Sequence, residues 1–179
     1  MTTPSTHYSY MDSPIGPLML TSQGGGITGV YMDAQKYAPG REAGWEEGGD
    51  GILAEARAEL EAYFRGELTE FTLPLAPRGT PFQLAVWHAL CSIPYGETTS
   101  YGELARRVGK ASASRAVGGA NGHNPIAIIV PCHRVIGANG TLTGYGGGLE
   151  RKRALLALEA ETLARRGITL GGQRTLALA

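Results

Sequence analysis

The segment Ile126-Ala127-Ile128-Ile129-Val130-Pro131-Cys132-His133-Arg134 decides how we interpret the second half of this 179-residue sequence. Its apolar run, bounded by Pro125 and Pro131, predicts a short and fully buried strand. A main chain that emerges from a core can hold the next side chain rigidly at a surface. Here that side chain belongs to Cys132, which is therefore the leading candidate for a nucleophile.

Cys132 has the chemistry to act from this position. A thiol reacts as its thiolate, and a nearby imidazolium, guanidinium or backbone amide lowers its usual pKa of about 8.5. His133 and Arg134 could supply such groups. An inert buried cysteine is the alternative, because free cysteine is among the most buried residue types. Only Cys91 accompanies Cys132, so a disulfide framework is excluded.

His133 is the candidate base for this thiol. Adjacent side chains of an extended segment point to opposite faces, so we expect a water molecule to relay the proton from Cys132 to His133. Glu159, on a helix predicted from Leu149 to about Arg165, could hold His133 in the required tautomer. A solvated carboxylate on that helix is the alternative. The histidines and cysteines show no CxxC or HxxxH spacing, so we predict no metal.

Three helices are predicted upstream of this segment, each opened by a capping residue. The second and third are about four residues apart and resemble a helix-turn-helix. In the third, small residues permit close backbone approach to a narrow groove, and Arg115 stands out as the one long cation. The starts are marked by Thr80 with Pro81 and Gln83, by Ser100 with Glu103 for a helix over Tyr101 to Val108, and by Ser112 for a helix from Ala113 toward Asn121.

Charge is divided unevenly along the chain. Residues 1–100 carry five basic and twelve acidic side chains, whereas residues 101–179 carry eleven basic and four acidic ones. The second half is therefore the half expected to work on a polyanion. Arg115 could fill the place of a base that leaves a duplex, or it could contact a phosphate or an acidic neighbour. Lys110 is a candidate phosphate contact, with a solvated helix surface as the alternative.

The first half predicts a separate mixed α/β domain. Strands around residues 16–21 and 27–32 flank a glycine-rich turn and form a hairpin, and apolar residues at helical spacing follow over residues 52–64. A short strand over residues 71–75 comes next. Prolines then place a boundary near residue 79, which gives domains 1–79 and 80–179. No apolar run is long enough to span a bilayer and no leader is visible, so we expect a cytoplasmic protein without membrane contact.

Several of these pieces together closely resemble one family, the O6-alkylguanine-DNA alkyltransferases. The resemblance covers roughly residues 80–160 in order and spacing, and its most specific parts are the Arg-Ala-Val-Gly-Gly-Ala and Pro-Cys-His-Arg-Val segments. It implies an α/β fold with an N-terminal mixed α/β lobe, ribonuclease-H-like, followed by a mainly helical, winged-helix-like DNA-binding lobe that carries the cysteine. The matching stretches are Tyr101-Gly102-Glu103-Leu104, Ser114 to Ala120, Asn124-Pro125, Pro131 to Val135, Gly144-Tyr145 and Gly147-Gly148-Leu149.

The resemblance implies a monomeric repair protein that acts once, without a cofactor. Its cysteine would take an alkyl group from O6 of guanine in double-stranded DNA, with O4 of thymine as a second substrate, after the base flips out through the minor groove. In the reaction it implies that Cys132 is the acceptor, His133 the base, Glu159 the acid that orients His133, and Asn124 the brace of the active-site turn. On DNA it implies that Tyr101 flips the base and donates to guanine, Arg115 replaces the flipped nucleotide, and Ala116 and Lys110 contact the duplex. The implied base pocket is lined by Val135, Tyr145, Gly146 and Gly147.

Two other functions stay open at this point. A noncatalytic helix-turn-helix regulator would account for the basic half and the paired helices, but not for Cys132 and His133. A cysteine hydrolase would use these two residues, and it would turn over an ester or amide repeatedly. An alkyltransferase-like damage sensor without an acceptor cysteine is disfavoured by the presence of Cys132.

Overall fold

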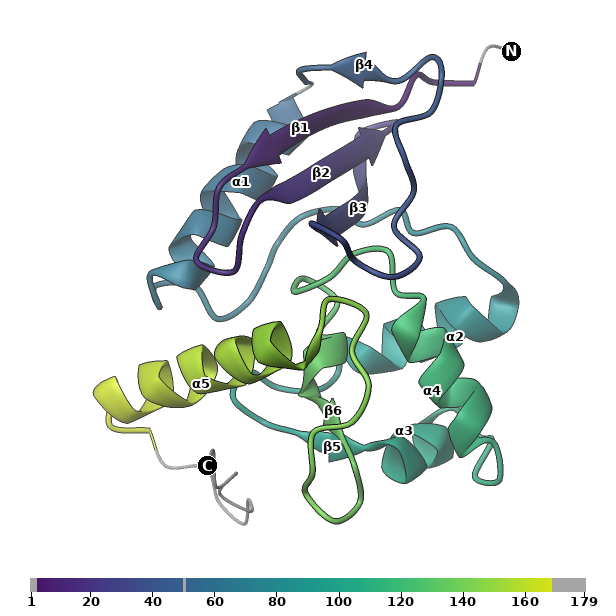
Figure 1. Ribbon diagram of the computed structural model, residues 1–179, viewed down its shortest axis with the longest axis vertical. Coiled ribbons are helices and arrows are strands. Elements are labelled where there is room, and N and C mark those ends of the chain that lie inside the picture. The colour runs from purple at the N-terminus through teal and green to yellow at the C-terminus, as the bar shows by residue number, and fades with distance from the viewer. Residues whose placement is uncertain (1–2, 50, 169–179) are drawn as a thin grey trace. The chain divides into compact units, whose positions relative to one another are not determined.

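The computed structural model describes residues 3–49 and 51–168, and the chain in it forms two compact units (Figure 1). Unit 1 comprises Met1–Arg78 and Pro125–Ile129, and unit 2 comprises Gly79–Asn124 and Val130–Ala179. Unit 1 contains a sheet and one helix, and unit 2 is mainly helical. The predicted α/β fold class is therefore confirmed. Residues 125–129, which lie beyond the boundary predicted near residue 79, group with unit 1.

Unit 1 is built on a four-stranded sheet. Its strands are β1 (His7–Met11), β2 (Leu18–Gln23), β3 (Gly26–Met32) and β4 (Glu46–Glu47), in the order β3-β2-β1-β4. Neighbours among the first three strands are antiparallel, and β4 pairs in parallel with β1. The predicted hairpin is confirmed as β2-β3. Gly24 and Gly25 form its turn with φ of 59° and 81°, values that favour glycine.

Helix α1 (Gly51–Phe64) covers one face of this sheet, as Figure 1 shows. Its buried residues are three or four positions apart, which is the spacing of one helix face. They pack on a sheet face whose apolar side chains are fully buried, so this layer is the core of unit 1. The buried side chains are Leu53, Ala56, Leu60 and Tyr63 from the helix and Leu18, Leu20, Ile27 and Val30 from the sheet.

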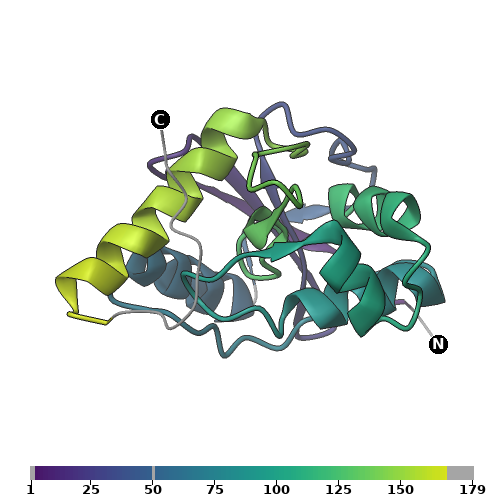
Figure 2. The same cartoon turned by 90° about the horizontal axis from the view of Figure 1, so that it is seen from below.

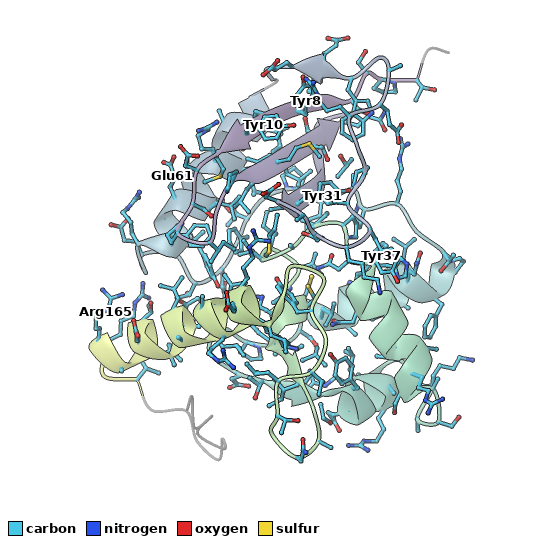
Figure 3. All side chains as sticks on the ribbon, viewed as in Figure 1. Tyr8, Tyr10, Tyr31, Tyr37, Glu61 and Arg165 are labelled. Carbon is cyan, nitrogen blue, oxygen red and sulfur yellow. The ribbon has the colours of Figure 1, made fainter. Side chains whose placement is uncertain are left out.

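Strand β1 was not predicted, although its alternation offered a signal. Tyr8 and Tyr10 are two positions apart, so their side chains leave the strand on the same side. Figure 3 labels both, and their rings meet edge to face with centroids 5.9 Å apart. The short strand predicted over residues 71–75 is wrong. Only Leu75 forms an isolated bridge, to Ile27, because Pro74 has no N–H to donate to a ladder.

The buried strand predicted over residues 126–130 is also wrong in conformation, although its burial is correct. Ile126 forms an isolated bridge with Val30, and turns follow it. Ile128 has φ of 72°, and the N–H of Ile129 donates to the carbonyl of Ala127 at 2.8 Å. These values describe a γ-turn with positive φ, which is rare and strained. Because a positive φ at Ile128 lies outside the β region, the chain cannot continue as a strand through residues 126–130.

Unit 2 is formed by helices α2 (Pro81–Leu90), α3 (Tyr101–Arg107), α4 (Ser114–Gly122) and α5 (Leu149–Arg165). Two short strands, β5 (Thr99–Ser100) and β6 (Val135–Ile136), pair in parallel, and the turn η1 (Cys132–Arg134) directly precedes β6. Figure 2 shows α3 and α4, the predicted helix-turn-helix pair, side by side. The indole N–H of Trp87 in α2 donates to the carbonyl of Ala120 in α4 at 2.8 Å.

Three of the four predicted helix starts in unit 2 are confirmed. Thr80 and Gln83 form the complete capping box, and Ser100 accepts a hydrogen bond from the backbone of Glu103. Helix α5 begins at Leu149 as expected. The predicted cap of α4 at Ser112 is wrong, because the N-cap is Ala113 and no side chain caps this end. None of the helices in the described part of the chain is long and apolar enough to cross a membrane.

Thr80→Ala is expected to destabilise the protein by about 1 kcal/mol, because it removes the side-chain acceptor for the first turn of α2. Urea unfolding followed by circular dichroism would measure the change. Thr80→Ser retains the hydroxyl group and should unfold close to the wild type. Equal unfolding midpoints for Thr80→Ala and the wild type would mean that the capping box contributes nothing to stability.

Candidate active site

The turn that carries Cys132 is held by the backbone and by two buried asparagines. The N–H of Cys132 donates to the carbonyl of Val130 at 2.8 Å across Pro131, and the N–H of Val135 donates to the carbonyl of Cys132. Asn124 donates from Nδ2 to the carbonyl of Val130 at 2.8 Å, and Asn121 donates to the carbonyl of Cys132 at 3.4 Å. Asn124 therefore makes a hydrogen bond to the turn that it was predicted to brace. Asn121 makes a second such bond, and sequence reasoning did not assign it to the turn.

The thiol of Cys132 is buried, with 5% of the residue exposed. Burial is the largest influence on it and raises its pKa above the usual value. The side chains of Asn124 and Tyr145 and the positive charge of Lys152 oppose this rise. The lowered pKa that the sequence suggested is therefore not found. Cys132 rests as a thiol and needs a base when it reacts.

His133 points to the predicted acid. Residues 132–134 form a 3₁₀ turn rather than an extended strand, and His133 Nε2 lies 2.7 Å from Glu159 Oε1. Both side chains are completely buried, so Glu159 is not the solvated surface carboxylate that the sequence left open. Burial raises the pKa of Glu159, but His133 and Arg134 oppose this effect and hold the pKa at about 2. An ionised carboxylate only accepts, so the proton of neutral His133 is on Nε2.

The other ring nitrogen of His133 is a free acceptor. Its Nδ1 has no hydrogen-bond partner among the residues that the structure describes. Burial lowers the pKa of His133, and the charges of Arg134 and Lys152 lower it further, while Glu159 raises it. The net direction is downward, so the imidazole is neutral at pH 7 and can accept a proton on Nδ1.

Lys152 is a residue of this site that sequence reasoning missed. It is fully buried on α5, and its Nζ donates to the carbonyls of Thr143 at 2.9 Å and Gly144 at 3.3 Å. Burial lowers its pKa to about 8, against the attraction of Cys132. A signal was available, because Lys152 lies three and seven positions before Leu155 and Glu159 on the buried face of its helix.

Tyr101 and the predicted base-pocket residues converge on the same region. The hydroxyl of Tyr101 donates to the carbonyl of Thr143 at 3.1 Å, and Cys132 influences the pKa of Tyr101, which burial raises. Burial also raises the pKa of Tyr145, and the nearby Cys132 raises it further. Val135 is buried in β6, and Gly146 and Gly147 occupy the centre of a turn closed by a 3.0 Å bond from Gly148 to Tyr145.

Tyr101 is the one predicted DNA-contacting residue in this cluster, and the other three lie outside it. Arg115 and Ala116 are exposed in the first turn of α4, and Lys110 is exposed before it. No carboxylate in the described part of the chain pairs with Arg115, so the acidic-neighbour alternative has no support there. Arg106 instead pairs with Glu103 at 2.6 Å.

The cluster is equipped for nucleophilic attack by a thiol. It combines a buried soft nucleophile, a neutral imidazole with a free acceptor nitrogen, and tyrosine hydroxyls that can stabilise a leaving group. Across residues 3–49 and 51–168, no three His, Cys, Asp or Glu side chains gather as metal ligands would. The exposed first turn of α4 adds the cation of Arg115, which no carboxylate of residues 3–49 and 51–168 pairs with.

Comparison with known protein families identifies the chain. Residues 6–77 match the ribonuclease-like domain of 6-O-methylguanine DNA methyltransferase, and residues 81–161 match the DNA-binding domain of the same protein. The chain belongs to the 6-O-methylguanine DNA methyltransferase family. The resemblance seen in the sequence is thereby confirmed, and the match extends to the first half of the chain.

Individual members of this methyltransferase family are close relatives. The methylated-DNA–protein-cysteine methyltransferase of Mycobacterium tuberculosis is 60% identical over 153 residues, which are 86% of this chain and 92% of the relative. That of Methanosarcina acetivorans is 53% identical over 86% of this chain and 97% of its own. The crystal structure of Mycobacterium tuberculosis OGT in complex with DNA matches with a TM-score of 0.83 and 59% identity, over 87% of this chain and 94% of that chain.

Proposed function

We propose that this protein repairs DNA by taking an alkyl group from O6 of guanine onto Sγ of Cys132. Repair by alkyl transfer to a cysteine is the activity of the family to which the chain belongs. The observation that carries the assignment to Cys132 is its burial beside His133, whose Nε2 bonds Glu159 at 2.7 Å and whose Nδ1 is unpaired among the described residues. Cys91, the other cysteine, is exposed.

The reaction is a displacement at the alkyl carbon. The Sγ–H proton of Cys132 passes through a water molecule to Nδ1 of His133, and the thiolate attacks the carbon attached to O6. A carbon–sulfur bond forms, the carbon–oxygen bond breaks, and its electron pair stays on the guanine. Tyr101 stabilises this charge by donating to the ring. The thioether has no step that restores the thiol, so each molecule acts once and needs no cofactor.

The base has to leave the duplex before it can reach a buried thiol. Extrusion costs a few kcal/mol of unstacking, which contacts to the opened duplex have to offset. In this proposal Arg115, which is exposed in the first turn of α4, fills the vacated position through the minor groove, and Ala116 allows close approach of the helix. Lys110 contacts phosphate, while Tyr101 pushes the phosphate next to the flipped nucleotide.

The remaining parts of the proposal concern organisation. Residues 1–79 form a supporting N-terminal domain and residues 80–179 form the domain that carries out the transfer. Asn124, Val135, Tyr145, Gly146 and Gly147 shape the pocket around the thiol. O4-alkylthymine is a second substrate of the same pocket. We expect a monomer in the cytoplasm, where a reducing environment keeps Cys132 as a free thiol.

The proposed function is tested by intact-mass spectrometry after incubation with a duplex that carries one O6-methylguanine. The protein should gain one methyl group and no more, however large the excess of duplex. Repeated demethylation by one protein molecule would favour the cysteine hydrolase described above. Binding to one DNA sequence, without any preference for the lesion and without a gain of mass, would favour a regulator.

Arg115→Ala is expected to slow methyl transfer from duplex DNA by at least about tenfold, because part of the cost of base extrusion is no longer offset. Transfer from O6-methylguanine as the free base needs no extrusion and should be unchanged. Single-turnover rates on the two substrates would separate these effects. Arg165→Ala, which removes an exposed cation at the end of α5 (Figure 3), is the matched control. An equal loss on both substrates would place Arg115 in the reaction rather than in base flipping.

A further inference from the structure

Arg134 makes more contacts to the proposed acid than His133 does. Its Nε lies 3.0 Å from Oε2 and 3.2 Å from Oε1 of Glu159, and its Nη2 lies 2.9 Å from Oε1. The backbone N–H of Gly96 adds a further bond to Oε2 at 3.1 Å. A guanidinium that grips both oxygens in this way fixes the carboxylate in position and orientation.

Arg134 is itself held from its other side. Its Nη1 donates to the carbonyl of Ile93 at 2.7 Å, and its guanidinium carbon lies 5.5 Å from the centre of the Tyr95 ring. The residue is only 6% exposed. These contacts hold the guanidinium on both sides, so the place of Glu159 depends on Arg134 and not on His133 alone.

We propose that Arg134 is a positioning residue that keeps His133 a neutral imidazole, with Nδ1 ready to accept the proton of Cys132. The inference rests on the proposed function, because it assigns a task to the partner of the proposed base. It follows from the balance of charges in the buried cluster and from the contacts of Arg134 to Glu159 and Ile93.

The charge count distinguishes this cluster from a simple acid–imidazole pair. In such a pair the carboxylate is balanced only by protonation of the imidazole, so it promotes the charged form. Here Arg134 already balances Glu159. A proton taken by His133 from bulk water would leave a net positive charge in a buried site that also contains Lys152. Burial makes that charge costly.

A proton taken from Cys132 has a different consequence. It leaves a thiolate next to the new imidazolium, so the cluster gains an ion pair and no net charge. The arrangement therefore opposes protonation of His133 by solvent but permits transfer from the thiol. The charged and titratable groups that act on His133 are Glu159 and Lys152 from α5 and Arg134 from its own turn, and Cys132 is its neighbour in the chain.

The contacts also explain why lysine would be a poor substitute. An ammonium group is a compact charge that cannot grip two carboxylate oxygens in parallel and still bond the carbonyl of Ile93. Arg134→Lys would keep the charge balance but loosen the carboxylate. Arg134→Met would remove the charge while retaining much of the apolar length, and Glu159 would keep its bond to His133 but lose its guanidinium partner.

The test combines the pH dependence of methyl transfer with the state of the His133 ring. Single-turnover rates on an O6-methylguanine duplex would be measured from pH 5.5 to 9, and ¹⁵N shifts of labelled histidine would report the ring. In the wild type we expect a neutral ring at pH 7 with its proton on Nε2. In Arg134→Met the ring should be protonated at pH 7, and the acidic limb of the rate profile should move up by about one pH unit or more. Arg134→Lys should shift it less.

Two other outcomes would contradict the proposal. If Arg134→Met lowers the rate by the same factor at every pH while the ring stays neutral, Arg134 is only structural and the proposal is wrong. If Arg134→Met does not fold, Arg134→Gln decides, because it removes the charge but keeps hydrogen-bond donors. A neutral ring and a pH profile identical to the wild type in that variant would overturn the proposal. Arg153→Met, at an exposed position of α5, is the control for loss of one arginine. Absence of transfer by the wild type would refute the proposed function, whereas the ¹⁵N shifts would still test the role of Arg134.

Discussion

Cys132→Ser is expected to abolish methyl transfer, with a rate more than about 10⁴-fold below that of the wild type. A hydroxyl group in place of the thiol is a much weaker nucleophile, and a buried site makes its deprotonation still less favourable. Because the substitution is small and Cys132 is buried beside Asn124 and Tyr145, the fold should be retained. Intact-mass spectrometry after incubation with an O6-methylguanine duplex would show no added methyl group.

Cys91→Ser is the matched control for this experiment. Cys91 is exposed and follows the last residue of α2, so its loss should leave the gain of one methyl group unchanged. Peptide mapping should place that group on Cys132. If the Cys132→Ser protein were methylated at Cys91, Cys91 and not Cys132 would be the acceptor, and the proposed assignment would be wrong. Binding of the lesion duplex by Cys132→Ser should persist, because Arg115 and Lys110 lie outside the buried cluster.

Local features of the fold could be predicted from the sequence because they depend on neighbouring residues. The capping box of Thr80 and Gln83 and the glycine turn at residues 24–25 each need only a few consecutive residues, and both were correct. The prediction of a cap at Ser112 was wrong, because the position of a helix start also depends on the turn before the helix. A serine before a helix permits a cap, but the turn that precedes α4 places Ala113 there instead.

Conformations imposed by the rest of the molecule could not be predicted. The apolar run at residues 126–130 has the composition of a strand, and nothing local indicates that Ile128 takes a positive φ. Only the surrounding structure can impose a conformation that is unfavourable for isoleucine. The same holds for Arg134. Its neighbours in sequence suggested a role in activating the thiol, whereas its contacts are with Glu159, twenty-five positions away.

The residues of the candidate site could be predicted where their side-chain type alone indicates the chemistry. Cys132 and His133 were identified from their order after an apolar run. Glu159 was proposed from its place on the helix predicted from Leu149, with a solvated carboxylate as the alternative. Lys152 was missed because a lysine on a helix is normally solvated. Its burial depends on the carbonyls of Thr143 and Gly144, which a distant turn brings to it.

Glu159→Gln is expected to cost about 3 kcal/mol of folding stability at pH 7. The carboxylate is fully buried and accepts bonds from His133, Arg134 and Gly96, so its neutral replacement leaves the guanidinium of Arg134 buried without a counter-charge. Urea unfolding at pH 7 would measure the loss. Glu161→Gln, two positions along α5 and exposed, should change stability by less than about 0.5 kcal/mol and is the control.

The pH dependence of this loss identifies its cause. The pKa of Glu159 is about 2 in the folded protein and about 4.5 in the unfolded chain, so its contribution is complete above the unfolded value and disappears as pH falls toward the folded value. The difference between wild type and Glu159→Gln should therefore narrow by about 1 kcal/mol for each pH unit between pH 4.5 and 2. A difference that stays constant over this range would mean that shape, and not the charge of Glu159, holds Arg134 and His133 in place.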